Sequence, residues 1–223
     1  MALSFDKYVV SVPGIKPYLD LSLNFVGFFT NWSTTDITDC STSSRWSECV
    51  VNTYHLCGQA AVDRAAHPQD WRWWDYSTCL YAQQYPAEEC AGLNPLDANH
   101  TCTRDEFPGI IRGVSDACAQ QAGLDATALN SCYDDGRGLA LLKASFAKTL
   151  TFPRNPHGYT EPQWLEVDGP SCDANFTECE PSFDKTACLD WDDCDSDAWA
   201  KHLLAQVCAK TDAQTTVDAC QPA

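Results

Sequence analysis

The chain has few basic residues, and this shortage excludes whole classes of partner. Its 223 residues include 14 Lys and Arg against 31 Asp and Glu, which gives a formal net charge of −17 at pH 7. A surface this acidic repels phosphate backbones, and the sequence contains no basic stripe with interleaved aromatic side chains. We therefore expect no binding to nucleic acid or to an anionic membrane surface.

Long apolar runs are missing as well. A membrane-spanning helix needs roughly 20 consecutive apolar residues, and the longest apolar stretches, residues 21–29 and 139–142, are much shorter. The first residues also lack the apolar core of a secretory signal, because Asp6 and Lys7 stand where it should be. We expect no membrane span, and we interpret this start as following a removed signal or as lying inside a longer precursor.

The sequence also contains no C-x-x-C pair. Zinc sites favour cysteines at such short paired spacings. A thioredoxin-type dithiol needs the same spacing, because a helix N-terminus lowers the pKa of the first thiol while the second resolves the mixed disulfide. Around Gly136 and Gly138 neither the Walker nor the dinucleotide phosphate-loop pattern is met. We expect no metal, no cofactor and no catalytic residue within these 223 residues.

Cysteine itself is abundant. An even number spread over most of the chain is typical of a secreted or lumenal protein stabilised by disulfides, so we expect all of these thiols to be bridged. The fourteen are Cys40, Cys49, Cys57, Cys79, Cys90, Cys102, Cys118, Cys132, Cys172, Cys179, Cys188, Cys194, Cys208 and Cys220. N-glycosylation sequons at Asn31, Asn99 and Asn175 agree with the same compartment.

The sequence has no linker that would divide it into two domains and no internal repeat, so we predict one domain over residues 1–223. Apolar residues at helical spacing favour helices over 49–63, 71–84, 105–122 (interrupted near Pro108), 125–132, 138–149 and 198–210. Residues 18–29 and 164–169 have the character of strands. This order suggests an α/β or α+β domain, with residues 171–196 forming a cysteine-rich acidic insert within it.

Two local patterns have competing interpretations. Asp193, Asp195 and Asp197 have a calcium-like spacing but lack the glycine and closing glutamate of an EF-hand loop, which favours a solvated acidic turn. Trp71 and Trp74, in the run Trp-Arg-Trp-Trp, could form a carbohydrate platform. Their helical spacing instead favours packing in the core.

The stretch CVVNTYHLC, residues 49–57, carries two cysteines on one predicted helix. Eight residues of helix rise about 12 Å, which exceeds the Cα separation that a disulfide tolerates. We therefore predict that Cys49 and Cys57 do not pair with each other and that each is bound elsewhere.

The same stretch resembles the signature of the gamma-interferon-inducible lysosomal thiol reductase (GILT) family, which ends in cysteine, two residues, asparagine, four residues and cysteine. Cys49, Asn52 and Cys57 reproduce that ending, Glu48 is retained, and Cys40 stands farther upstream than the family's first cysteine. Three later stretches are similar to the family in the same order: Cys132 with Gly138 and Leu141, Pro156-His157-Gly-Tyr159 with Trp164, and the terminal helix around 203–208.

This resemblance implies an α/β, thioredoxin-like fold with a helical insertion, made in the secretory pathway and acting on protein disulfides in acidic compartments. The family's catalytic C-x-x-C lies at the end of a strand that is absent here, so we expect the fold to be incomplete at its N-terminus. The substrate-facing loop would hold Pro162, Gln163 and Trp164, with Gln163 where the family has a cis-proline.

Two hypotheses remain open. The first is a GILT-like thiol–disulfide oxidoreductase whose catalytic dithiol is missing from this chain; the second is a non-catalytic, disulfide-stapled structural or interaction module on the same scaffold. Under either hypothesis the protein would be secreted or lysosomal. It would act on a protein disulfide substrate or bind a protein partner, either alone or as a subunit of a larger assembly. Seven cysteines occupy family-like positions, namely Cys40, Cys49, Cys57, Cys79, Cys118, Cys132 and Cys208, and the other seven are interpreted as added staples.

Overall fold

The structure, a computed structural model, describes residues 2–25, 27–41, 46–83, 106–149, 196–210 and 213–221, in two compact units. We name the described residues between 22 and 149 the helical unit, and residues 2–21 with those from 196 onward the terminal unit. The single domain predicted over residues 1–223 stays a prediction. Several predicted features lie outside the described residues: the strand 164–169, residues 171–195 of the insert, Asn99, Asn175, Asp193, Asp195, Pro162, Gln163, Trp164, and Cys90, Cys102, Cys172, Cys179, Cys188 and Cys194.

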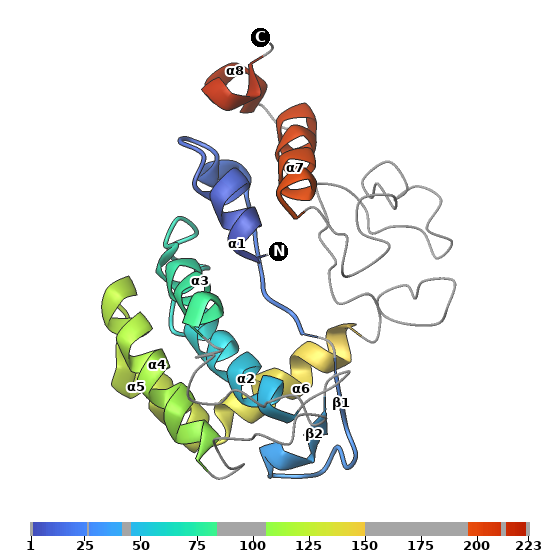
Figure 1. Cartoon of the computed structure of the whole chain (residues 1–223), viewed down its shortest axis with the longest axis vertical. Coiled ribbons are helices and arrows are strands. Elements are labelled where there is room, and N and C mark those ends of the chain that lie inside the picture. Colours follow the sequence, from blue (N-terminus) through green and yellow to red (C-terminus); the bar gives the residue numbers. More distant parts are fainter. Residues whose placement is uncertain are drawn as a thin grey trace, which may run out of the picture. The chain divides into compact units, whose positions relative to one another are not determined.

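The helical unit contains five longer helices and a minimal hairpin (Figure 1). In chain order these are β1 (Phe28–Phe29), the 3-10 turn η3 (Ile37–Asp39), β2 (Cys40–Ser41), α2 (Trp46–Ala60), α3 (Arg72–Gln83), α4 (Phe107–Ala122), α5 (Ala126–Asp134) and α6 (Arg137–Thr149). The two strands pair antiparallel, with Phe29 opposite Cys40. Helix α2 contacts each of α3, α4, α5 and α6, so it is the central element of the unit.

Local signals explain where these helices begin and end. Helix α4 closes on Gly123, whose φ of 70° is left-handed, and Leu124 N–H returns to the Ala119 carbonyl at 2.8 Å. Asp125 then caps α5, because its Oδ1 accepts from the backbone N–H of Thr127 at 2.9 Å. The predicted helices therefore agree with the observed ones to within a few residues at each end.

The interruption predicted near Pro108 is wrong, because α4 runs without a break from Phe107 to Ala122. Pro108 lies in the first turn of that helix, where its missing N–H would have no intrahelical acceptor. Proline at this place marks the start of a helix rather than a break within one.

The strand predicted over residues 18–29 is also wrong for most of its length, since among its described residues only Phe28 and Phe29 pair as strand. The preceding N–H groups find partners on helices instead of on a neighbouring strand. Leu23 N–H donates to Gln59 Oε1 at 2.6 Å, and Phe25 N–H donates to Ser145 Oγ at 2.7 Å. These helix side chains take the place of the backbone acceptors that a neighbouring strand would supply. The segment is therefore extended without belonging to a sheet.

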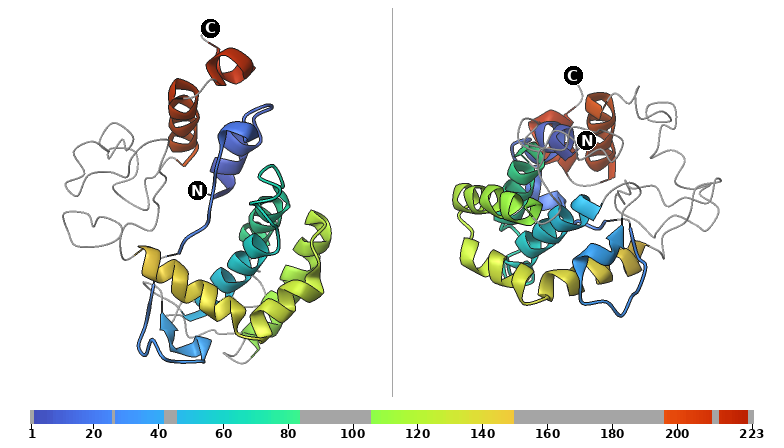
Figure 2. Two further views of the ribbon diagram at one scale, coloured as in Figure 1. Left: turned by 180° about the vertical axis from the view of Figure 1, so that it is seen from behind. Right: turned by 60° about the horizontal axis from the view of Figure 1, so that its bottom comes forward.

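Two clusters of buried side chains form the core of the helical unit. The larger one joins α2, α3, α4 and α5, and it includes Tyr54, Tyr76, Leu80, Phe107, Ile111 and Leu129. The smaller one joins β1, β2, α2 and α6 through Phe29, Cys40, Cys49, Leu56, Leu142 and Phe146. Figure 2 shows the same hairpin beside α6 and the start of α2 in its two further views.

The terminal unit brings the two ends of the described chain together. It contains α1 (Ala2–Phe5), the π-helix η1 (Asp6–Val10), the 3-10 turn η2 (Lys16–Tyr18), α7 (Ser196–Lys210), α8 (Ala213–Thr216) and the 3-10 turn η4 (Asp218–Cys220). The Tyr8 hydroxyl donates to Asp197 Oδ2 at 2.7 Å, and Ile15 packs with Val207 and Val217. Asp197, one of the calcium candidates, is therefore engaged in contacts with the N-terminal segment.

Within the described residues every strand belongs to the two-residue pair, and helix predominates. The disulfide-rich part of the predicted fold class is confirmed by four bridges. The thioredoxin-like α/β fold stays a prediction.

Candidate functional site

The two cysteines of the signature stretch lie on α2 and are bound in different directions. Cys49 is bonded to Cys40 on β2, with a Cα separation of 6.2 Å, and Cys57 is bonded to Cys132 on α5, with a Cα separation of 5.9 Å. All four are buried. The prediction that Cys49 and Cys57 do not pair with each other is confirmed. Helix α2 is instead covalently joined to β2 and to α5.

Two further disulfides complete the described set. Cys79 on α3 bonds to Cys118 on α4, and Cys208 on α7 bonds to Cys220 in the terminal unit. The first joins two family-like positions, whereas the second joins a family-like cysteine to one interpreted as an added staple. Since seven family-like cysteines is an odd number, at least one of them must pair outside its own group or remain unpaired. No cysteine within the described ranges is free.

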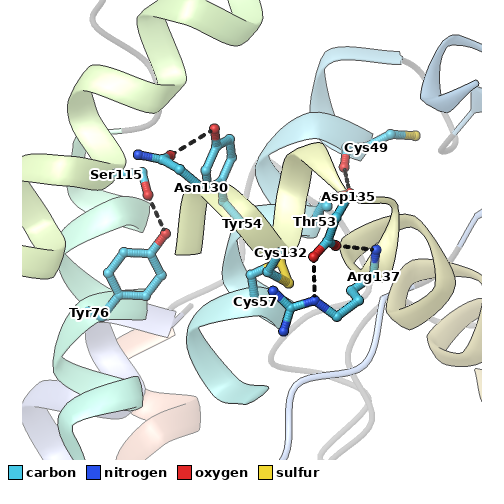
Figure 3. Close-up of a disulfide and its surroundings, with 10 residues drawn as sticks. All are labelled: Cys49, Thr53, Tyr54, Cys57, Tyr76, Ser115, Asn130, Cys132, Asp135 and Arg137. Carbon is cyan, nitrogen blue, oxygen red and sulfur yellow. Dashed lines mark hydrogen bonds and ion pairs between the residues drawn. A yellow bond between two sulfur atoms is a disulfide. The ribbon is translucent and has the colours of Figure 1, made fainter. Parts of the chain in front are cut away.

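Helices α2 and α6 lie close together beside the Cys57–Cys132 disulfide (Figure 3). A Cβ atom placed on Gly138, at the start of α6, would lie 2.4 Å from Thr53 Cγ2 and 3.0 Å from Cys57 Sγ. The same atom would lie 3.2 Å from the carbonyl oxygen of Cys132. Only glycine fits here, and the reason is the helix contact, because Gly138 does not have a positive φ.

Polar side chains of α2, α4 and α5 form a hydrogen-bonded network near the same disulfide. The Tyr54 hydroxyl donates to Asn130 Oδ1 at 3.4 Å, Asn130 Nδ2 donates to Asp116 Oδ1 at 2.8 Å, and Arg112 pairs with Asp134. Burial raises the pKa of Tyr54 to about 12, so its hydroxyl stays protonated and can donate at neutral and acidic pH. These side chains join α2, α4 and α5, of which only α2 and α5 are also joined directly by a disulfide in the described residues.

A pair of buried hydroxyl groups joins α3 to α4. Tyr76 Oη lies 2.8 Å from Ser115 Oγ, and both side chains are fully buried (Figure 3). Burial raises the pKa of Tyr76 above its ordinary value, which keeps this hydroxyl neutral. The ring also lies against Gly58 of α2, where an added Cβ would come within 2.3 Å of Tyr76 Cδ1. The three helices therefore meet at closely fitted small and aromatic residues.

The tryptophans of the run at residues 71–74 are core residues. Trp71, Trp73 and Trp74 are at most 7% exposed, and Trp73 packs edge-on against Trp74. His55 is likewise buried, with its ring centroid 4.2 Å from that of Tyr81 and 5.8 Å from that of Phe25. The interpretation of the tryptophans as core packing is confirmed, and the carbohydrate platform is excluded for these rings.

Two ion pairs lie at the starts of helices α3 and α6. Arg72 lies on Asp70 with a closest N–O distance of 2.6 Å, and Arg137 lies on Asp135 at 2.7 Å. The pKa of Asp70 is lowered from 3.8 chiefly by the hydrogen bond from the Arg72 side chain. That of Asp135 is lowered from 3.8 chiefly by the backbone N–H of Arg137. Because the folded values lie below the unfolded one, the stabilisation is complete above pH 3.8 and is lost as the pH falls through the folded values.

We therefore expect these two pairs to keep their stabilising effect in a moderately acidic compartment. The difference in free energy of unfolding between the wild type and the double variant Asp70→Asn, Asp135→Asn should be the same at pH 7 and pH 5, and should shrink below about pH 3.8. Denaturant titrations at pH 7, 5 and 3 measure it. A difference that has already halved at pH 5 would contradict the direction of these pKa shifts.

The described residues arrange no reactive thiol and no group of three His, Cys, Asp or Glu side chains suited to a metal ion. In the helical unit they form a support whose elements are joined by disulfides. Sequence reasoning missed the side chains that hold the extended segment to this support, Gln59 and Ser145. The sequence did contain an indication for Ser145. It is a polar residue between Leu142 and Phe146 on the apolar face of α6, and a buried polar side chain needs a hydrogen-bond partner.

No protein-family model, no curated protein and no solved structure matches this chain. Among the described helices none has both the length and the apolar character that crossing a membrane requires.

Proposed function

We propose that this chain is a GILT-like protein of the thiol–disulfide oxidoreductase class, and that the helical unit is the family's helical insertion. One observation carries the proposal: the Cys57–Cys132 disulfide joins the end of the signature stretch to the start of the Cys132–Gly138–Leu141 stretch, 75 residues later. Two stretches chosen for their resemblance to the same family are thus covalent neighbours in space.

The packing around this disulfide supports the proposal independently of the spacing. Gly138 belongs to the resembling pattern, and it is the residue that allows α6 to lie against Thr53 and Cys57 of α2. A residue of the resembling pattern thus lies at a close contact between α2 and α6. This agreement supports the proposal.

The proposed reaction is disulfide exchange in a secreted or lysosomal setting. A thiolate attacks one sulfur of a protein disulfide, a mixed disulfide forms, and the other substrate sulfur leaves as a thiolate; a second thiol then displaces the reduced substrate, and the dithiol becomes a disulfide. The 223 residues contain no C-x-x-C, so this dithiol must come from outside them. On a thioredoxin-like fold, Pro162, Gln163 and Trp164 would face the substrate.

A second candidate function is favoured by a different observation. All eight cysteines of the described residues are in disulfides, seven of the eight are buried, and the remaining one, Cys220, is partly buried. In this alternative the chain is a non-catalytic, stapled interaction module on the same scaffold, and it binds a protein partner without exchanging sulfur with it.

The experiment compares the native polypeptide, captured from its source with an antibody against the 223-residue chain, with the recombinant chain itself. The proposal expects the native polypeptide to reduce a fluorescence-quenched disulfide peptide at pH 5, and alkylation to abolish this activity. The 223-residue chain is the matched control, and it should show neither activity nor a reactive thiol when it is unfolded without reductant. A native polypeptide that has no reactive thiol after mild reduction and no activity would establish the stapled module instead.

A further inference from the structure

The sequon at Asn31 lies in a turn that is held on the helical unit by hydrogen bonds. Asn31 Oδ1 accepts from the backbone N–H of Ser33 at 3.0 Å, and the Asn31 carbonyl accepts from Thr34 N–H at 3.0 Å. Lys143 of α6 donates from Nζ to the carbonyls of Trp32 at 2.8 Å and of Thr34 at 2.6 Å. Asn31 itself is exposed, so the turn presents it to solvent from a defined backbone.

Exposed aromatic side chains flank this asparagine. Phe28, three residues before it, is 53% exposed, and Trp32, directly after it, is 43% exposed. They are two of the three large apolar side chains that stand out in the described residues; the third, Leu3, is 48% exposed and lies in the other unit. Trp32 is fixed by an edge-on contact with Phe29, at 5.6 Å between ring centroids. Two large apolar rings are therefore exposed close to the acceptor along the chain, Phe28 on β1 and Trp32 in the turn.

We infer that Asn31 carries an N-linked glycan whose first N-acetylglucosamine packs on Phe28 and Trp32 and stabilises the helical unit. In the attachment, Nδ2 of Asn31 forms a bond to the anomeric carbon of a lipid-diphosphate-linked oligosaccharide, the bond from that carbon to the diphosphate breaks, and Nδ2 loses one proton. One face of the sugar ring presents C–H groups, which are attracted to the negative faces of aromatic rings. The sugar that would cover these rings is therefore attached to the neighbouring Asn31.

The glycan suits this surface better than a second copy of the chain does. The formal net charge of −17 opposes self-association, and two side chains give much less buried area than a stable protein interface needs. A neutral sugar adds no charge to the acidic surface. The inference rests on one part of the proposed function, passage through the secretory pathway, and on no catalytic step.

The test uses the full chain, secreted behind a leader from a host that adds high-mannose glycans, with Asn99→Gln and Asn175→Gln so that Asn31 is the only acceptor. Peptide mass spectrometry should find Asn31 occupied. Three forms are compared by thermal unfolding: intact glycan, glycan trimmed to one N-acetylglucosamine, and the Asn31→Gln chain. We expect the first two to melt together, about 2 to 4 °C above the third.

The aromatic rings are tested in the same three forms. In the double variant Phe28→Ala, Trp32→Ala the difference between glycosylated and unglycosylated chains should vanish. In Leu3→Ala, a control with a similarly exposed apolar side chain elsewhere, the difference should remain. Each ring is then changed alone to divide the effect between them.

Three results would overturn the inference: an unoccupied Asn31 in the secreted chain, a glycan effect that survives loss of both rings, or an unglycosylated chain that dimerises through Phe28 and Trp32. None of these outcomes bears on thiol chemistry. Failure of the glycan inference and failure of the proposed oxidoreductase function are therefore distinguishable.

Discussion

Removing the Cys57–Cys132 disulfide with the pair Cys57→Ala, Cys132→Ala is expected to lower the free energy of unfolding by about 4 kcal/mol. The bridge spans 75 residues, but Cys79–Cys118 spans 39 residues within that loop and stays closed, which leaves an effective loop of about 36 residues. The entropy that a cross-link removes from the unfolded chain grows with the logarithm of loop length. Buried Tyr54 and Leu129 belong to the same core cluster as both cysteines, so the loss should reach the whole helical unit. Denaturant titration of the full, unreduced chain by circular dichroism measures it.

The matched control removes Cys40–Cys49, which closes a loop of 9 residues. The same relation gives about 2.5 kcal/mol for that bridge, so the two double variants should differ by about 1 kcal/mol. Both bridges are buried and both include one cysteine of α2, which leaves loop length as their chief difference. Equal losses would contradict the role of Cys57–Cys132 as the principal covalent joint.

Gly138→Ala is expected to destabilise the chain by about 1 to 3 kcal/mol, the usual cost of forcing an extra methyl group into a closely packed contact. The atoms that it would meet are poorly able to move. Thr53 is β-branched and its hydroxyl donates to the Cys49 carbonyl at 2.7 Å; Cys57 is fixed by its disulfide; and the third atom is the backbone oxygen of Cys132. Thermal and denaturant unfolding of the full chain measure the change.

Gly113→Ala is the matched control, since Gly113 also lies within a helix but an added Cβ would meet nothing within 4 Å. There alanine should stabilise by about 0.5 to 1 kcal/mol through its higher helix propensity. Thr53→Ser removes the methyl group that lies nearest to the added Cβ and keeps the hydroxyl, so it should partly restore the stability of Gly138→Ala. If the two glycine variants behaved alike, the close α2–α6 contact would not exist in solution.

The helices were largely predictable, because their apolar periodicity and their capping residues are local. Asp125 and Gly123 mark a boundary that chain-neighbour interactions alone define. The strand over residues 18–29 was not predictable in the same way. Alternating apolar residues indicate an extended chain, but a strand also requires a partner strand. Here the side chains of Gln59 and Ser145 accept the backbone hydrogen bonds that a partner strand would otherwise accept.

The candidate site likewise combines features that the sequence indicates with contacts that only the packing shows. The resemblance singled out Gly138 in the sequence, but only the packing of α6 on α2 shows why no other residue fits there. The sequon at Asn31 and its aromatic neighbours are also visible in the sequence, whereas the anchoring of this turn by Lys143 depends on a residue more than 100 positions away. Spacing rules carry no information about such contacts.

By itself the sequence determined that Cys49 and Cys57 cannot pair, because eight residues of helix separate them by more than a disulfide spans. It also determined the positions of the helices and the acidic surface. Only the tertiary structure decided which cysteine each of them meets, Cys40 for Cys49 and Cys132 for Cys57. Fourteen cysteines allow very many pairings, and the one observed depends on which helix faces come within about 6 Å of each other, a property of packing over long sequence separations.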